Sequence, residues 1–108
     1  MTRLFVTLFA LILALPALAQ DTAEAPEVDE KVVSCGYQAD VVAAVQQARL
    51  ERVAERNVPE HVMAQSPAWP EKYNNVIPLI TPWVYEQKRK IIRNEDLSAA
   101  WSELCLQQ

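Results

Sequence analysis

The sequence has very little of two residues on which common protein chemistry depends. It contains a single glycine, Gly36, and a single histidine, His61, in 108 residues. One glycine cannot form the glycine-rich loops that cradle phosphates, so P-loop and dinucleotide-binding proteins are excluded. Tight hairpin turns also depend on glycine, so a sheet built of hairpins is not expected. We therefore predict an all-α fold.

The scarcity of histidine argues against an enzyme. Acyl transfer needs a nucleophile, a base and an orienting group placed together, and no nucleophile motif surrounds any of the serines. His61 lies on a short amphipathic segment, where a surface role is the usual one. We expect no catalytic residues, no cofactor and no enzymatic activity.

Only two cysteines are present, Cys35 and Cys105. They form no Cys-x-x-Cys motif, which argues against a thioredoxin-like redox role, and together with His61 they supply too few ligands for zinc. An even number of cysteines in a small exported chain indicates a disulfide. The pair predicts one bond that closes a long loop, worth about 4 kcal/mol by the chain-entropy argument.

Long apolar runs are missing except near the N-terminus. Residues 4–15 are almost entirely apolar, and Pro16 ends the run just before the small-x-small sequence that finishes at Ala19. This run is shorter than the roughly 20 residues that a membrane span needs. Residues 1–19 therefore predict a signal peptide cleaved after Ala19, a periplasmic or secreted location, and no stable membrane span after its removal.

Basic residues are fewer than acidic ones. Ten Lys and Arg stand against 14 Asp and Glu, a net charge of −4, and much of the acidic excess lies in residues 20–33. An acidic chain does not attract nucleic acid through its overall field. The acidic segment is poor in large apolar side chains, which is typical of a flexible tail. We interpret it as a solvating tether, with docking to a basic partner as the alternative.

Residues 34–108 carry apolar side chains at helical spacing. They predict one domain, a small bundle of three to five helices closed by the disulfide. The first helix is predicted over residues 34–57 and a short second helix over residues 59–65. The disulfide would then join the start of the first helix to the end of the last.

Prolines divide the second half of the chain. A third helix is predicted to open at Pro70, and Pro78 and Pro82 would either kink it or split it, because each removes a backbone donor. Asn94 is the predicted N-cap of the last helix, with two acidic residues following it in the first turn.

Two groups of cations are candidate interaction residues. Arg49 is predicted to be partly buried, where it either binds a carboxylate or carbonyl or extends its head to solvent at the border of the apolar face. Lys88, Arg89 and Lys90 form a short basic cluster. This cluster would face lipid head groups, lipopolysaccharide or a protein partner, or else lie solvated at a helix C-terminus.

Aromatic side chains give a further candidate. Three tryptophans and three tyrosines are present, and both phenylalanines lie in the predicted signal peptide. Trp69, in a loop flanked by prolines, is a candidate exposed anchor for a partner. The alternative is that these aromatic side chains replace Phe in the core.

Four features of the chain match a known pattern: Cys35 opening a helix, the pair Ala48-Arg49, the pair Val84-Tyr85, and Cys105 near the end. In these the chain resembles a family of small, uncharacterised, exported bacterial proteins. The resemblance implies a small helical fold with one disulfide and no established activity. It also implies that Arg49 and Tyr85 form a structural polar pair.

The leading functional prediction is a binding or interaction module whose partner is an unidentified protein or envelope component. The alternative is an acid-stress periplasmic chaperone, in which protonation of acids loosens the bundle and exposes apolar surface. The acids gather in residues 20–33 rather than among the apolar stripes, which favours the first prediction.

Overall fold

The computed structural model describes residues 29–108. The predicted signal peptide, residues 1–19, and most of the predicted tail lie outside the described residues. Within residues 29–108 the secondary structure is entirely helical, and the predicted small all-α bundle is confirmed. No helix in this part of the chain is both long and apolar enough to cross a membrane.

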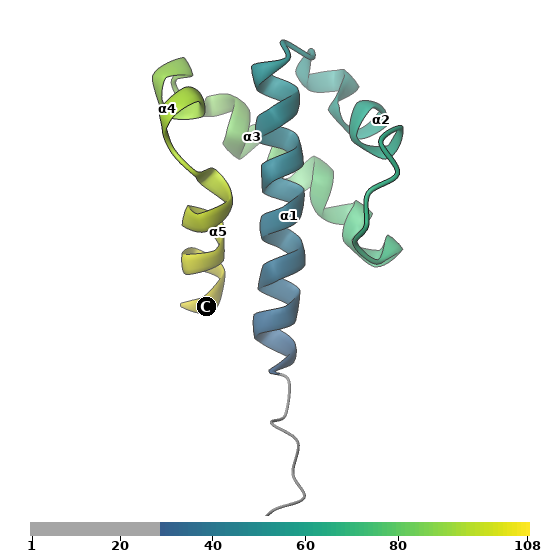
Figure 1. Cartoon of the computed structure of the whole chain (residues 1–108), viewed down its shortest axis with the longest axis vertical. Helices are drawn as coiled ribbons and strands as arrows, with labels where there is room; N and C mark the ends of the chain where they lie inside the picture. The colour runs from purple at the N-terminus through teal and green to yellow at the C-terminus, as the bar shows by residue number, and fades with distance from the viewer. Residues whose placement is uncertain (1–28) are drawn as a thin grey trace, which may run out of the picture.

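Helix α1 (Glu30–Leu50) is the long central element (Figure 1). It begins four residues before the predicted start, within the predicted tail, because the Asp29 carboxylate accepts a hydrogen bond from the backbone N–H of Lys31 at 3.0 Å and caps the first turn. One face of α1 is buried, and it consists of Cys35, Val41, Val42, Val45 and Ala48.

The end of α1 differs most from prediction. The helix ends at Leu50 rather than at residue 57, because Arg52 adopts a left-handed conformation with φ of 63°. The N–H of Val53 then donates to the carbonyl of Ala48, and that of Arg52 to the carbonyl of Arg49, both at 3.0 Å. These two bonds form a Schellman motif, a helix ending that usually places glycine where Arg52 stands.

A short 3₁₀ turn, η1 (Glu55–Asn57), and helix α2 (Val58–Met63) follow. The predicted third helix is split rather than kinked: a 3₁₀ segment, η2 (Glu71–Val76), precedes helix α3 (Ile77–Glu86). Pro78 lies in the first turn of α3, where a missing N–H leaves no helical bond unmade. Pro82 lies inside α3 on its exposed side.

Helix α4 (Arg89–Asn94) and helix α5 (Leu97–Leu106) complete the fold. The predicted N-cap at Asn94 is wrong, since Asn94 is the last residue of α4. Asp96 caps α5 instead, and its carboxylate accepts from the N–H of Ala99 at 3.1 Å and from the hydroxyl of Ser98 at 2.6 Å.

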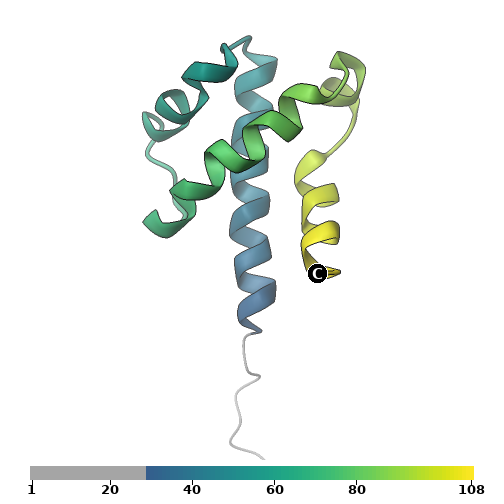
Figure 2. The ribbon, with the colours of Figure 1, turned by 180° about the vertical axis from the view of Figure 1, so that it is seen from behind.

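The other elements pack around α1. Helix α5 runs antiparallel beside it, and α3 crosses it diagonally, as Figure 2 shows. A single apolar core joins α1, α2, α3, α4 and α5. The predicted disulfide is present between Cys35 and Cys105, whose Cα atoms are 5.7 Å apart, and it joins α1 to α5.

Candidate functional site

The end of α1 and helix α4 lie at the same end of the molecule (Figure 1). Four arginines from these two parts of the chain line one pocket. The pocket has a volume of about 190 Å³. We call it the arginine pocket, and it is lined by Arg49, Leu50, Arg52, Arg89, Ile92 and Arg93. The three residues from α4 share one side of that helix because they stand at i, i+3 and i+4.

The charges of this pocket are not neutralised by nearby acids. Within residues 29–108 the one contact of 4.0 Å or less between a basic side-chain nitrogen and a carboxylate oxygen of Asp or Glu joins His61 to Glu51, at 3.0 Å. None of the four arginines therefore has a carboxylate at ion-pairing distance in the described part of the chain. Clustered charges of one sign repel one another and disfavour the compact state, so the arrangement calls for an explanation beyond folding.

Arg49 is the most enclosed of the four. Its Nη2 donates to the backbone carbonyl of Gln87 at 3.3 Å, and its guanidinium carbon lies 4.9 Å from the centre of the Tyr85 ring. Its Nε is buried and has no hydrogen-bond partner. The expected carbonyl partner is thus Gln87, and Arg49 and Tyr85 are in contact, as the resemblance implies.

Tyr85 also fixes the turn that holds Arg52. Its hydroxyl donates to the carbonyl of Val53 at 2.6 Å, which ties α3 to the residue just after Arg52. Burial raises the pKa of Tyr85 above 10.0. The charge of Arg49 lowers this pKa and the charge of Glu55 raises it, and both effects are smaller than that of burial. The hydroxyl therefore stays protonated at neutral pH and remains a donor.

Gln46 holds α4 in place against α1. Its Nε2 donates to the carbonyls of Ile92 and Glu95, both at 2.8 Å, and its Oε1 accepts from the N–H of Leu97 at 3.2 Å. One side chain thus satisfies the end of α4 and the start of α5 together. Sequence reasoning missed Gln46, because a single glutamine within a helix gives no signal of a long-range partner.

The predicted basic cluster is divided by the fold. Arg89 lines the arginine pocket, whereas Lys88 and Lys90 are exposed and are not among its lining residues. Lys88 is the N-cap of α4, and Arg89 and Lys90 are its first two residues. The cluster therefore lies at the start of a helix and not at a helix C-terminus. Neither Arg52 nor Arg93 was among the predicted interaction residues.

Trp69 does not belong to this site. It is half-buried against the core, and its indole N–H donates to the Asn74 side chain at 2.9 Å. Trp83 and Trp101 also pack together, with ring centres 5.3 Å apart. These contacts fit the interpretation of the aromatic side chains as core packing better than that of an exposed anchor.

His61 is part of a surface contact. Its Nε2 lies 3.0 Å from the Glu51 carboxylate and 2.9 Å from Nε2 of Gln65, and it links α2 to the end of α1. In the part of the chain that the structure describes, no group of three His, Cys, Asp or Glu side chains is arranged to hold a metal ion.

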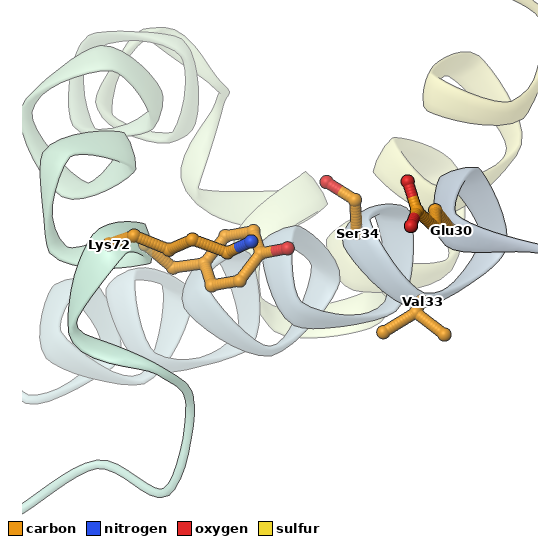
Figure 3. A pocket seen from close by; sticks show the side chains of 5 residues that line it. Glu30, Val33, Ser34 and Lys72 are labelled. Carbon is orange, nitrogen blue, oxygen red and sulfur yellow. The ribbon is translucent and has the colours of Figure 1, made fainter.

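A second hollow lies toward the other end of α1. This groove of about 610 Å³ is lined by Glu30, Val33 and Ser34 of α1 and by Lys72 and Tyr73 of η2 (Figure 3). The amino group of Lys72 lies 5.2 Å from the centre of the Tyr73 ring. The groove is lined by one acidic and one basic side chain, so it lacks the single-sign charge of the arginine pocket. Its lining therefore does not favour a particular kind of ligand.

Comparison with known proteins adds no assignment. No family model matches the chain, and no curated protein or solved structure is detectably similar to it. The resemblance to exported bacterial proteins stays a prediction.

Proposed function

We propose that the protein is a binding module whose arginine pocket recognises an anionic group of its partner. The observation that carries this proposal is the presence of four guanidinium groups around one pocket, without a described carboxylate at ion-pairing distance. Guanidinium groups match carboxylate and phosphate oxygens with paired hydrogen bonds, and they keep their charge at any physiological pH.

The surroundings of the pocket support a preorganised site. Gln46 fixes the backbone of α4, and Tyr85 fixes the turn that carries Arg52. A backbone fixed before a ligand arrives loses less freedom on binding, which raises affinity. The lining residues are four arginines and two aliphatic side chains, which can hold an anion but offer no proton acceptor for catalysis.

The disulfide is compatible with an extracellular location. Disulfides form and persist mainly in oxidising environments, so the Cys35–Cys105 bond supports the predicted export. The partner would then be an anionic component of the cell envelope or an exported protein with an anionic group. The acid-stress chaperone has less support, because the buried polar side chain of the described core is Thr81 and not a carboxylic acid.

Anion titration with matched variants tests the proposal. Arg89→Gln with Arg93→Gln removes two charges from the pocket, whereas Lys88→Gln with Lys90→Gln removes two charges from neighbouring exposed positions. With pyrophosphate as the probe at constant ionic strength, followed by the arginine Nε–Hε signals in NMR spectra, the arginine pair should lose about tenfold in affinity or more.

The variant Lys88→Gln with Lys90→Gln should bind pyrophosphate with an affinity within about twofold of that of the unmodified protein. Its substitutions change only the weak, nonspecific electrostatic field around the pocket. Equal losses in the two variants would show that pyrophosphate responds to net charge alone, and the proposal would be wrong.

A further inference from the structure

We infer that the group held by the arginine pocket is a phosphomonoester carried on an apolar substituent. This inference rests on the proposed anion-binding function and names the chemistry of the anion.

The number and origin of the donors favour phosphate over carboxylate. Each guanidinium carries five N–H donors, whereas a carboxylate offers two oxygens in one plane and a single negative charge. A phosphomonoester offers three terminal oxygens and a charge of about −1.5 to −2 at pH 7. Arg49 and Arg52 come from the end of α1, while Arg89 and Arg93 come from α4, so the donors belong to two separate elements. A tetrahedral anion can accept from both groups at once.

Arg49 gives a second, independent indication of a ligand. Its Nε is buried without an acceptor among the described residues, although its Nη2 already donates to Gln87. A buried donor without an acceptor is unfavourable. Since Nε has almost no accessible surface, an anion in the pocket would accept from it and remove that penalty only after the Arg49 side chain moves.

The backbone at Arg52 points in the same direction. A left-handed conformation disfavours every residue with a Cβ, and Arg52 adopts one with φ of 63° at a position where glycine is usual. Strain of this kind occurs at functional sites, and Ser66, outside the pocket, has a similar φ of 51°. At Arg52 the strained backbone coincides with a fourth positive charge in the same pocket.

The aliphatic walls and the size of the pocket define the rest of the ligand. Leu50 and Ile92 line the pocket; Leu50 is 42% exposed and gives it an accessible apolar wall, whereas Ile92 is 2% exposed. An apolar wall disfavours a fully hydrated inorganic ion and favours a carbon substituent. The volume of about 190 Å³ is less than the roughly 300–1,000 Å³ of pockets for drug-sized ligands, so the ligand group held there is small.

The test compares four soluble probes on the disulfide-bonded protein at pH 7.5 and constant ionic strength: hexyl phosphate, inorganic phosphate, diethyl phosphate and hexanoate. Hexyl phosphate should bind about tenfold more tightly than each of the others, and Arg89→Gln with Arg93→Gln should abolish the difference. The lysine pair Lys88→Gln with Lys90→Gln should keep it, and circular dichroism should confirm that both variants are folded.

The outcomes separate this inference from the proposed function. Hexanoate or diethyl phosphate binding as tightly as hexyl phosphate would overturn the phosphomonoester but leave anion binding standing. Inorganic phosphate binding as tightly as hexyl phosphate would overturn the apolar substituent. Failure of all four probes and of pyrophosphate to saturate the pocket would overturn both proposals.

Vesicles distinguish the two sources of such a group. Phosphatidic acid carries a phosphomonoester and phosphatidylglycerol a phosphodiester, so vesicles of equal total charge differ in this group. Preferential binding to phosphatidic acid would support a membrane lipid as the source. Binding to hexyl phosphate without that preference would support a soluble phosphate ester.

Discussion

Replacement of Arg52 by glycine is expected to stabilise the protein while weakening its binding of anions. Arg52 ends α1 in the left-handed region, with φ of 63°, and such a conformation costs a residue with a Cβ about 1–2 kcal/mol. Glycine removes this cost, but it also increases the conformational entropy of the unfolded chain, which lowers the free energy of unfolding by about 0.5–1 kcal/mol. Removal of one of four like charges adds a few tenths of a kcal/mol. The net gain is about 1 kcal/mol.

Thermal unfolding followed by circular dichroism measures this gain. For a domain of this size, 1 kcal/mol corresponds to a rise in Tm of about 4–8 °C. Titration with hexyl phosphate measures the second effect, and its affinity for Arg52→Gly should fall about tenfold because one guanidinium is lost.

Two further variants separate strain from charge. Arg52→Ala removes the guanidinium but keeps a Cβ in the left-handed region, so it should lose anion affinity without the gain in Tm. Ser66→Gly relieves a similar conformation, with φ of 51°, at a residue outside the arginine pocket. It should raise Tm and leave anion affinity unchanged. If Arg52→Gly melts no higher than Arg52→Ala, the argument from backbone strain is refuted.

Three other substitutions test the account of the fold. Gly36→Ala should stabilise by about 0.5–1 kcal/mol in urea unfolding, because Gly36 lies within α1 and an added Cβ meets nothing within 4 Å; a loss of stability would contradict this. Gln46→Ala should destabilise by about 2 kcal/mol in the same assay, since three backbone groups lose their partner; an unchanged urea midpoint would show that water replaces them. The pKa of Asp96 is held below 3.8, first by the Ser98 hydroxyl and then by the Ala99 N–H. The stabilisation by the Asp96 carboxylate is therefore present above pH 3.8 and is lost as the pH falls through the lowered pKa. Asp96→Asn should flatten the pH dependence of Tm below about pH 4. An unchanged pH dependence of Tm in this range would contradict the argument.

The sequence predicted the class of fold and the disulfide because both depend on local patterns. Apolar spacing and the scarcity of glycine indicate helices, and two cysteines within one chain permit a single intramolecular pairing. The end of α1 was missed for a physical reason. The usual signal of a Schellman ending is glycine, and here Arg52 occupies that position.

The site was only partly predictable. Arg49 and Arg89 were both singled out, but nothing in their spacing shows that they line one pocket with Arg52 and Arg93. Their meeting depends on the turn from α3 into α4 and on the hydrogen bonds that Gln46 makes to residues far along the chain. Asn94 was the predicted N-cap of the last helix, but α4 continues through it and Asp96 is the N-cap of α5.

The central position of α1 has a consequence for how the molecule opens. Helix α5 packs mainly on α1, whereas α2 and α3 cover another part of the same helix (Figure 1). Neither group can separate fully without exposing part of the buried face of α1, to which Val41, Val42 and Val45 belong. In hydrogen–deuterium exchange, the amides around Val41 and Val45 should therefore exchange only by global unfolding, while those of α2 exchange earlier through local opening. A ligand bound at the end of α1 would accordingly slow exchange in both groups of helices together.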